Sequence, residues 1–156
     1  MSEPITDKLI QLKHLTMGAR MWRDIAEDIE NGTYALIYDM KEGWLKERGL
    51  LSQYMDYQEC PACKIAGYKG NEDSICNPNL CPIQWGDKAC FTAFGEFYIL
   101  EDALNHLAYL VRQYNPEQYR EYVEAVKKYS KKIYMLHLEA IERITKELLE
   151  EAKDER

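Results

Sequence analysis

Residues 7–30, DKLIQLKHLTMGARMWRDIAEDIE, carry the clearest structural signal in the sequence. Apolar side chains recur here every three or four residues, which is the spacing of one face of an α-helix. They are Leu9, Leu12, Leu15, Ala19, Trp22, Ile25, Ala26 and Ile29. Thr6-Asp7 is suited to begin a helix and Asn31-Gly32 to end it. The pattern predicts a helix over 7–30 and a mainly α fold.

A second helix is expected directly after the first, over about 33–48. It ends before Gly49, a residue that readily takes the left-handed cap conformation. Its apolar side consists of Ile37, Met40, Trp44 and Leu45, with the stem of Lys41 beside them. Because the connection at Asn31-Gly32 is short, we expect the segment 7–48 to form an antiparallel helical hairpin.

The C-terminal part of the chain, 97–154, predicts two more helices. The first covers about 97–111, and the second begins with Asn115 as N-cap and Pro116 in the first turn. It continues to about Lys153, which gives a length of about 57 Å at 1.5 Å per residue. Such a length exceeds a small domain, so we expect either a break near Ser130 or a partner subunit, and hence a homodimer.

The last helix is expected to bury a broad face. Its main row alternates steps of four and three residues, and a second row adds positions seven apart. The two rows are Tyr119, Val123, Val126, Ser130, Ile133, His137, Ala140, Ile144 and Glu147, with Tyr122, Tyr129 and Leu136 beside them. A helix with two such rows covers more than one neighbour, so the expected architecture is a bundle formed by the hairpin and the long C-terminal helix.

Composition places the chain among globular, intracellular proteins. Its 156 residues fit a single domain, with 46% hydrophobic and 30% charged residues. The net charge is −7, and no segment is basic, which disfavours binding to nucleic acid phosphates. The N-terminal residues lack an apolar signal core, and no stretch approaches the ~18 apolar residues of a membrane span. We therefore expect a cytoplasmic protein without membrane contact.

Five cysteines fall within one window of 31 residues: Cys60, Cys63, Cys76, Cys81 and Cys90. The surrounding segment, 60–95, has no helical periodicity and is rich in proline and glycine. An irregular stretch of this length inside a domain needs something local to organise it. Thiols stay reduced in the cytosol, so the cluster favours metal ligands over disulfides. The sequence predicts a metal-stapled insertion over 60–95.

Zinc is the metal that this pattern favours. The ion takes four ligands in a tetrahedron, and Cys60-x2-Cys63 forms one ligand-bearing turn. Cys81 is the third expected ligand, and Cys76 and Cys90 compete for the fourth place. An iron–sulfur cluster is the alternative, and free or oxidised thiols are a third reading. A zinc ion with four thiolates has no open position for substrate, so the expected site is structural and the protein is not an enzyme.

Other candidate residues carry weaker signals. The chain has three histidines, His14, His106 and His137, of which His106 could replace one thiolate. Asp24 and Asp28 are spaced to share a cation on one helix face, although solvated helix charges are the commoner reading. Sequence patterns of serine hydrolases, P-loops, zinc peptidases and dinucleotide-binding proteins do not occur.

Tyrosine and lysine are concentrated toward the C-terminus. Seven of the twelve tyrosines lie between Tyr98 and Tyr134. Core packing explains most of them, and the rest suit a protein interface or a stacked nucleotide. Lys127, Lys128, Lys131 and Lys132 form the one basic cluster. Its expected role is a solvated helix face, with nucleic acid binding as the alternative.

Several motifs in order along 17–100 together resemble one group of proteins. They are Met21-Trp22-Arg23-Asp24-Ile25-Ala26, Trp44-Leu45-Lys46-Glu47, Cys60-x2-Cys63, Cys81-Pro82-Ile83, Cys90 and Phe97-Tyr98. The chain is similar to small cysteine-rich proteins of unassigned function carried by tailed bacteriophages and prophages. It departs from their pattern because four residues, not two, separate Cys76 from Cys81.

The resemblance implies a protein made in the cytoplasm of an infected bacterium. Combined with the closed ligand set and acidic charge, it leads us to expect a non-catalytic, zinc-stabilised accessory protein that binds and modulates a host protein. Two alternatives remain open at this point. One is an oligomeric sponge that sequesters a host signalling nucleotide, and the other is a zinc-dependent nucleic-acid-binding protein.

Overall fold

A computed structural model describes residues 3–51, 83, 96–110 and 119–154 of the chain. Helices fill almost all of these ranges. They are α1 (Glu3–Glu30), α2 (Ile37–Glu47), α5 (Glu96–Leu110) and α6 (Arg120–Asp154). Within the same ranges there is no strand, so the predicted mainly α fold class is confirmed.

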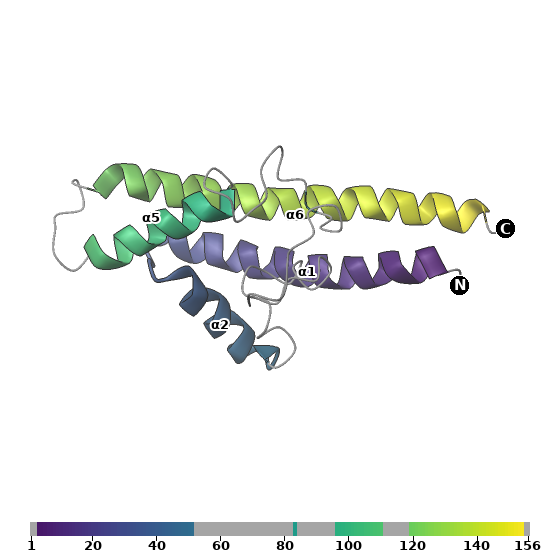
Figure 1. Cartoon of the computed structure of the whole chain (residues 1–156), viewed down its shortest axis with the longest axis horizontal. Coiled ribbons are helices and arrows are strands. Elements are labelled where there is room, and N and C mark those ends of the chain that lie inside the picture. The colour runs from purple at the N-terminus through teal and green to yellow at the C-terminus, as the bar shows by residue number, and fades with distance from the viewer. Residues whose placement is uncertain (1–2, 52–82, 84–95, 111–118, 155–156) are drawn as a thin grey trace, which may run out of the picture.

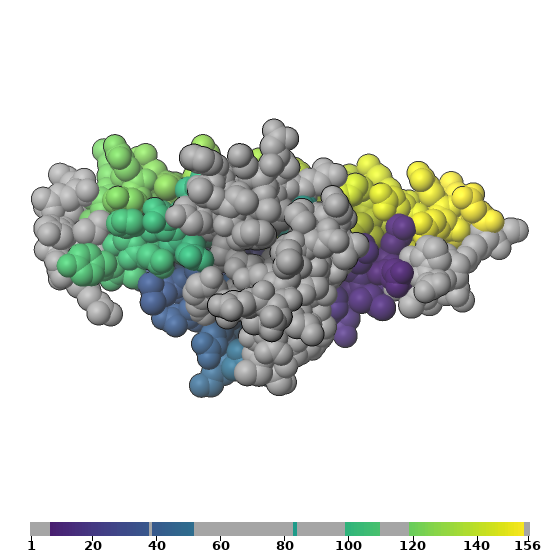
Figure 2. Space-filling model, viewed as in Figure 1, coloured from purple at the N-terminus to yellow at the C-terminus, as the bar shows by residue number. Residues whose placement is uncertain are grey.

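The two longest helices, α1 and α6, lie side by side and antiparallel along the long axis of the molecule (Figure 1). An ion pair joins them at each end of their contact. Lys8 Nζ lies 2.6 Å from Glu151 Oε1, and Lys131 Nζ lies 3.1 Å from Glu30 Oε2. In the space-filling view the first turns of α1 meet the last turns of α6 at one end of the molecule (Figure 2). These pairs fix which turn of α1 faces which turn of α6.

The core lies where α1, α5 and α6 meet. α6 packs most extensively against α1 and then against α5. The side chains that are buried most completely include Leu15, Trp22, Ile25, Ile29, Ile37, Leu100, Leu104, Leu107, Val126, Ile133 and Ala140. The main apolar row predicted for the last helix is buried from Tyr119 to Ile144, except that Val123 is half-buried, whereas Glu147 at its end is exposed.

α6 is one uninterrupted helix of 35 residues. The expected break near Ser130 is wrong: the Ser130 hydroxyl donates to the Lys127 carbonyl at 3.3 Å, and the backbone continues through this position without losing its helical pattern. The helix remains continuous because α1 and α5 together cover most of its length. The proposed cap, Asn115 and Pro116, lies outside the described residues.

Both predicted glycine stops are present. Gly32 and Gly49 have positive φ values of 90° and 68°. At the end of α1 the Thr33 amide donates to the Asp28 carbonyl at 2.9 Å, and at the end of α2 the Leu50 amide donates to the Leu45 carbonyl at 2.9 Å. This six-to-one bond with a left-handed residue inside it is the Schellman motif, which a side chain with a Cβ would strain.

The predicted hairpin is only partly correct. α2 does turn back toward α1, but it begins at Ile37 and not near Thr33, because the backbone is extended at Leu36, with ψ of 137°. It diverges obliquely from α1 (Figure 1) and contacts it over a small area. The main antiparallel partner of α1 is therefore α6. None of the helices in the described ranges is long and apolar enough to cross a membrane.

Candidate functional site

The five cysteines that define the predicted metal site all lie outside the described residues. The assignment of Cys60, Cys63, Cys76, Cys81 and Cys90 as zinc or iron–sulfur ligands therefore stays a prediction. Among the residues that the structure does describe, no cluster of three or more His, Cys, Asp or Glu side chains could hold a metal ion.

One residue of the cysteine-rich segment is described, and it is Ile83. Its side chain is only 3% exposed and belongs to the same apolar core as residues from α1, α5 and α6. Ile83 follows Cys81 by two residues. Ile83 therefore ties the cysteine-rich segment to the helical core at an interior point, and α5 begins at Glu96, directly after the segment ends.

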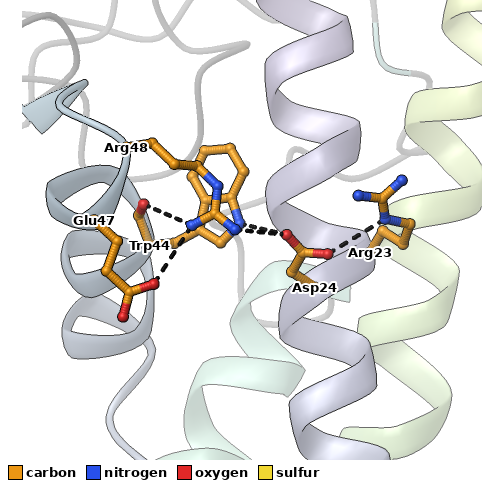
Figure 3. Close-up of polar contacts among 5 residues, drawn as sticks. All are labelled: Arg23, Asp24, Trp44, Glu47 and Arg48. Atoms are coloured by element: carbon orange, nitrogen blue, oxygen red, sulfur yellow. Dashed lines mark hydrogen bonds and ion pairs between the residues drawn. The ribbon is translucent and has the colours of Figure 1, made fainter.

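A polar network fastens α2 to α1 just before that segment begins (Figure 3). The Trp44 indole Nε1–H donates to Asp24 Oδ2 at 2.7 Å. Arg48 Nη2 donates to the same oxygen at 3.1 Å, and Arg23 Nε donates to Asp24 Oδ1 at 3.3 Å. One carboxylate of α1 thus accepts from an indole and a guanidinium of α2, and from a neighbour on its own helix.

Arg48 adds further contacts within α2. Its guanidinium carbon lies 4.0 Å from the centre of the Trp44 ring, a cation–π geometry. Arg48 Nη1 also donates to the Trp44 carbonyl at 3.0 Å and lies 3.6 Å from Glu47 Oε2. The planar guanidinium therefore spans both the aromatic face and the end of the helix. The network orients the last turn of α2, the point from which the chain enters the cysteine-rich region.

This network corrects the expectation for Asp24 and Asp28. Asp24 is a half-buried acceptor with three donors and not a fully solvated helix charge, and the described residues form no group of ligands around it and Asp28 that could hold a metal ion. Asp28 is exposed. Sequence reasoning missed the network because its partners are 20 and 24 residues apart, well beyond the local spacings that reveal helix faces. The one available signal was that Asp24 and Trp44 both belong to the motifs of the resemblance.

Two of the histidines have the same local bond but different surroundings. His106 Nδ1 lies 2.7 Å from the Asp102 carbonyl, and its exposed ring stacks on Tyr122 with centroids 5.0 Å apart. His137 Nδ1 lies 2.8 Å from the Ile133 carbonyl. A carbonyl oxygen only accepts, so in both rings Nδ1 carries the proton and, in the neutral form, Nε2 keeps its lone pair.

His137 is enclosed in the core, with 0% of its surface exposed. Its Nε2 has no hydrogen-bond partner in the part of the chain that the structure describes. His14 is also buried. His137 is thus packed in the core and hydrogen-bonded at one nitrogen, and the substitution of His106 for a thiolate stays a prediction.

The basic cluster on α6 is partly engaged within the molecule. Lys131 pairs with Glu30 across the α1–α6 contact, and the Lys128 ammonium lies 5.4 Å from the Tyr129 ring centre. Among the described tyrosines, Tyr119 is buried, Tyr122, Tyr129 and Tyr134 are half-buried, and Tyr109 is exposed. Core packing thus accounts for most of those on α6, and the nucleotide and nucleic acid alternatives remain predictions.

Two residues in the ion pairs between α1 and α6, Lys8 and Glu30, have shifted pKa values. The hydrogen bond to Glu151 raises the pKa of Lys8. The hydrogen bond to Lys131, with the charges of Lys131 and Lys127, lowers the pKa of Glu30. Burial raises the pKa of Tyr34. The two pairs therefore favour the charged forms that hold the long helices in register.

Comparisons of this chain with protein-family models, with curated proteins and with solved structures found no match.

Proposed function

We propose that the protein is a non-catalytic binding protein in which a helical scaffold presents a zinc-stapled, cysteine-rich segment to a partner protein. The observation that carries the proposal is the burial of Ile83 in the core of the scaffold. A segment held at Ile83 and at its junction with α5 loses part of its conformational freedom. A preorganised segment binds with a smaller ordering cost than a free loop of the same length.

Zinc is the metal that the ligand set favours. Four thiolates from Cys60, Cys63, Cys81 and either Cys76 or Cys90 would close the tetrahedron and leave no position for substrate. In small peptides such sites contribute about 10–16 kcal/mol of apparent binding free energy, which also serves as folding free energy. An iron–sulfur cluster would use the same thiolates.

The proposed partner is a protein of the bacterial host, and the proposed location is the host cytoplasm. The partner class rests on the resemblance to cysteine-rich phage proteins. The acidic net charge of −7 supports a protein partner more than nucleic acid. The Asp24 network supports the same view, because it orients the helix that leads into the presented segment.

Elemental analysis of the purified full-length chain tests the metal. We expect about one zinc ion per chain, lost when Cys60→Ser and Cys63→Ser are combined, and lower thermal stability after chelation. Cys76→Ser and Cys90→Ser are made separately as a matched pair. The variant that lacks the fourth ligand should lose the metal, and the other variant should keep it. Visible absorbance together with bound iron would show that the site holds an iron–sulfur cluster and not zinc. Absence of both metals would overturn the metal site.

Binding is tested with a partner captured from host lysate, purified and titrated against the protein by calorimetry. The Cys60→Ser, Cys63→Ser variant should lose affinity, while the exposed-surface variant Glu27→Ala on α1 should keep it. Equal affinity of both variants would show that the cysteine-rich segment is not the binding surface. Turnover of a substrate, abolished by one acid or base substitution, would contradict the non-catalytic proposal.

A further inference from the structure

The outward face of α6 carries a second apolar row that nothing in the described structure covers. Met135, Leu138 and Leu149 are 50%, 37% and 62% exposed. They lie on the side of the helix opposite the buried row that faces α1 and α5. Three large apolar side chains on one exposed helix face are more than isolated surface residues require.

The spacing of this outer row is that of a coiled-coil seam. Steps of three and four residues alternate along it for two and a half heptads. Its members are Met135, Leu138, Glu142, Thr145, Leu149 and Ala152. Thr145 fits this row because its hydroxyl already donates to the Ile141 carbonyl at 2.7 Å. α6 thus carries two heptad rows, of which the described chain fills one.

We propose that the outer row of α6 pairs antiparallel with the same row of a second copy of this chain. Charge favours this occupant and this direction. Glu139 and Lys146 flank the row one heptad apart, and antiparallel pairing sets each of them against the other residue of the second copy. Parallel pairing would set them against Tyr134 and Ile141 and would form no charge pair.

Apolar matching selects the register. With the two-fold axis between Glu142 and Thr145, Leu138 faces Leu149 of the second copy, because the two core positions of the heptad face each other across an antiparallel seam. Met135 then faces Ala152, and Glu142 faces Thr145. Shifts by one heptad in either direction place Leu138 against Glu142 or beyond the helix end. The charge of Glu142 is neutralised within each chain by Lys146, whose Nζ lies 3.4 Å from Glu142 Oε1.

The same register places an ion pair on the flank of the seam. Glu139 and Lys146 occupy equivalent flanking positions, one heptad apart, and face each other across the antiparallel pair. Two-fold symmetry gives two such pairs per dimer. All residues of the row belong to α6 and none is a cysteine, so the tests of the dimer and of the proposed metal site use different substitutions.

Sedimentation of the full-length chain in reducing buffer tests the dimer. We expect a concentration-dependent dimer whose Kd rises about 100-fold in Leu149→Glu, because symmetry removes two buried apolar contacts for each substitution. The matched control is Leu9→Glu, an equally apolar exposed residue on the outer side of α1, which should leave Kd unchanged. Circular dichroism and unfolding midpoints confirm that both variants fold.

A charge swap tests direction and register. Glu139→Lys alone and Lys146→Glu alone should each raise Kd several-fold, and the double variant should restore the wild-type value. A wild-type protein that stays monomeric at high micromolar concentration overturns the proposal, and so does a Leu149→Glu variant that dimerises like wild type. Failure of the double variant to restore binding overturns the antiparallel register.

Discussion

α1 makes two contacts of opposite character, one with α6 and one with α2. The contact with α6 is long and apolar, with fully buried side chains such as Leu15 and Trp22 along it. The contact with α2 is small and includes one carboxylate, Asp24, which accepts from Trp44 and Arg48. Both join the same helix to a neighbour, but they rely on different forces.

The difference separates stability from orientation. Burial of apolar surface is non-directional, so the α1–α6 contact provides most of the stability but tolerates small shifts. Hydrogen bonds to a half-buried carboxylate are directional, so the Asp24 network contributes less free energy and fixes the angle of α2. α2 buries only a short apolar side, Ile37, Trp44 and Leu45, so the directional bonds to Asp24 help to set the angle at which it leaves α1.

The largest effect is expected in the apolar contact. Leu15→Ala should lower the free energy of unfolding by about 2–5 kcal/mol, because it leaves a cavity in a close-packed core. The matched control is Leu9→Ala, the same substitution two turns earlier on α1, where 40% of the side chain is exposed against 0% for Leu15. Urea titration of both variants measures the difference. Equal losses would show that the α1–α6 contact is not the main source of stability.

A smaller effect is expected in the polar contact. Asp24→Ala should cost about 1–3 kcal/mol, because it leaves the buried Trp44 indole N–H without its acceptor. Asp28→Ala, one turn later and exposed, should change stability by less than about 0.5 kcal/mol. A double-mutant cycle with Trp44→Phe isolates the pair, and the coupling should fall within about 0.5–3 kcal/mol. A coupling of zero would mean that α2 is held by something other than this bond.

Prediction from sequence succeeded where the determining interactions are local. The helix of 7–30, the glycine stops at Gly32 and Gly49, and the buried row of α6 follow from spacing and from backbone conformations that neighbouring residues impose. The partner of α1 did not follow, because hydrophobic faces show that a helix packs but not against which neighbour. Short connections favoured α2, whereas the larger apolar face belonged to α6.

The candidate site shows the same limit. Cysteine spacing predicts ligands because a tight turn brings Cys60 and Cys63 together by local geometry alone. The Asp24–Trp44 bond joins residues on two helices, so its existence depends on the angle at which α2 leaves the turn at 31–36. The role of Ile83 was likewise hidden, since a single isoleucine in a segment rich in proline and glycine has no periodic neighbours to reveal its burial.

A third substitution, on the buried face of α6, should change the free energy of unfolding by a smaller amount and in the opposite direction. His137→Leu should raise the free energy of unfolding by about 1 kcal/mol, because a buried polar atom without a partner costs stability. The matched control is His106→Leu, which has the same bond to the carbonyl four residues earlier but an exposed ring. Chemical unfolding compares the two. A loss of more than about 2 kcal/mol for His137→Leu would indicate that Nε2 has a partner in the native protein.

The smallest effect concerns the ion pairs at the two ends of the α1–α6 contact. The pKa of Glu30 is lowered in the folded state, so its pair with Lys131 stabilises the fold above the ordinary carboxyl value of 4.5 and is lost as the pH falls through the folded pKa. The pKa of Lys8 is raised, so its pair with Glu151 stabilises below 10.5 and is lost as the pH rises through the folded pKa. Burial also raises the pKa of Tyr34, so ionisation of Tyr34 likewise lowers the stability of the fold at alkaline pH. The acid range therefore isolates the Glu30–Lys131 pair more cleanly.

Thermal melts between pH 3 and pH 6 should therefore show a slightly steeper loss of Tm in wild type than in Glu30→Gln. High salt should shrink the difference, because exposed charges are screened. Identical acid profiles would show that apolar packing alone sets the register of the two long helices, and that the Glu30–Lys131 ion pair makes no measurable contribution to it.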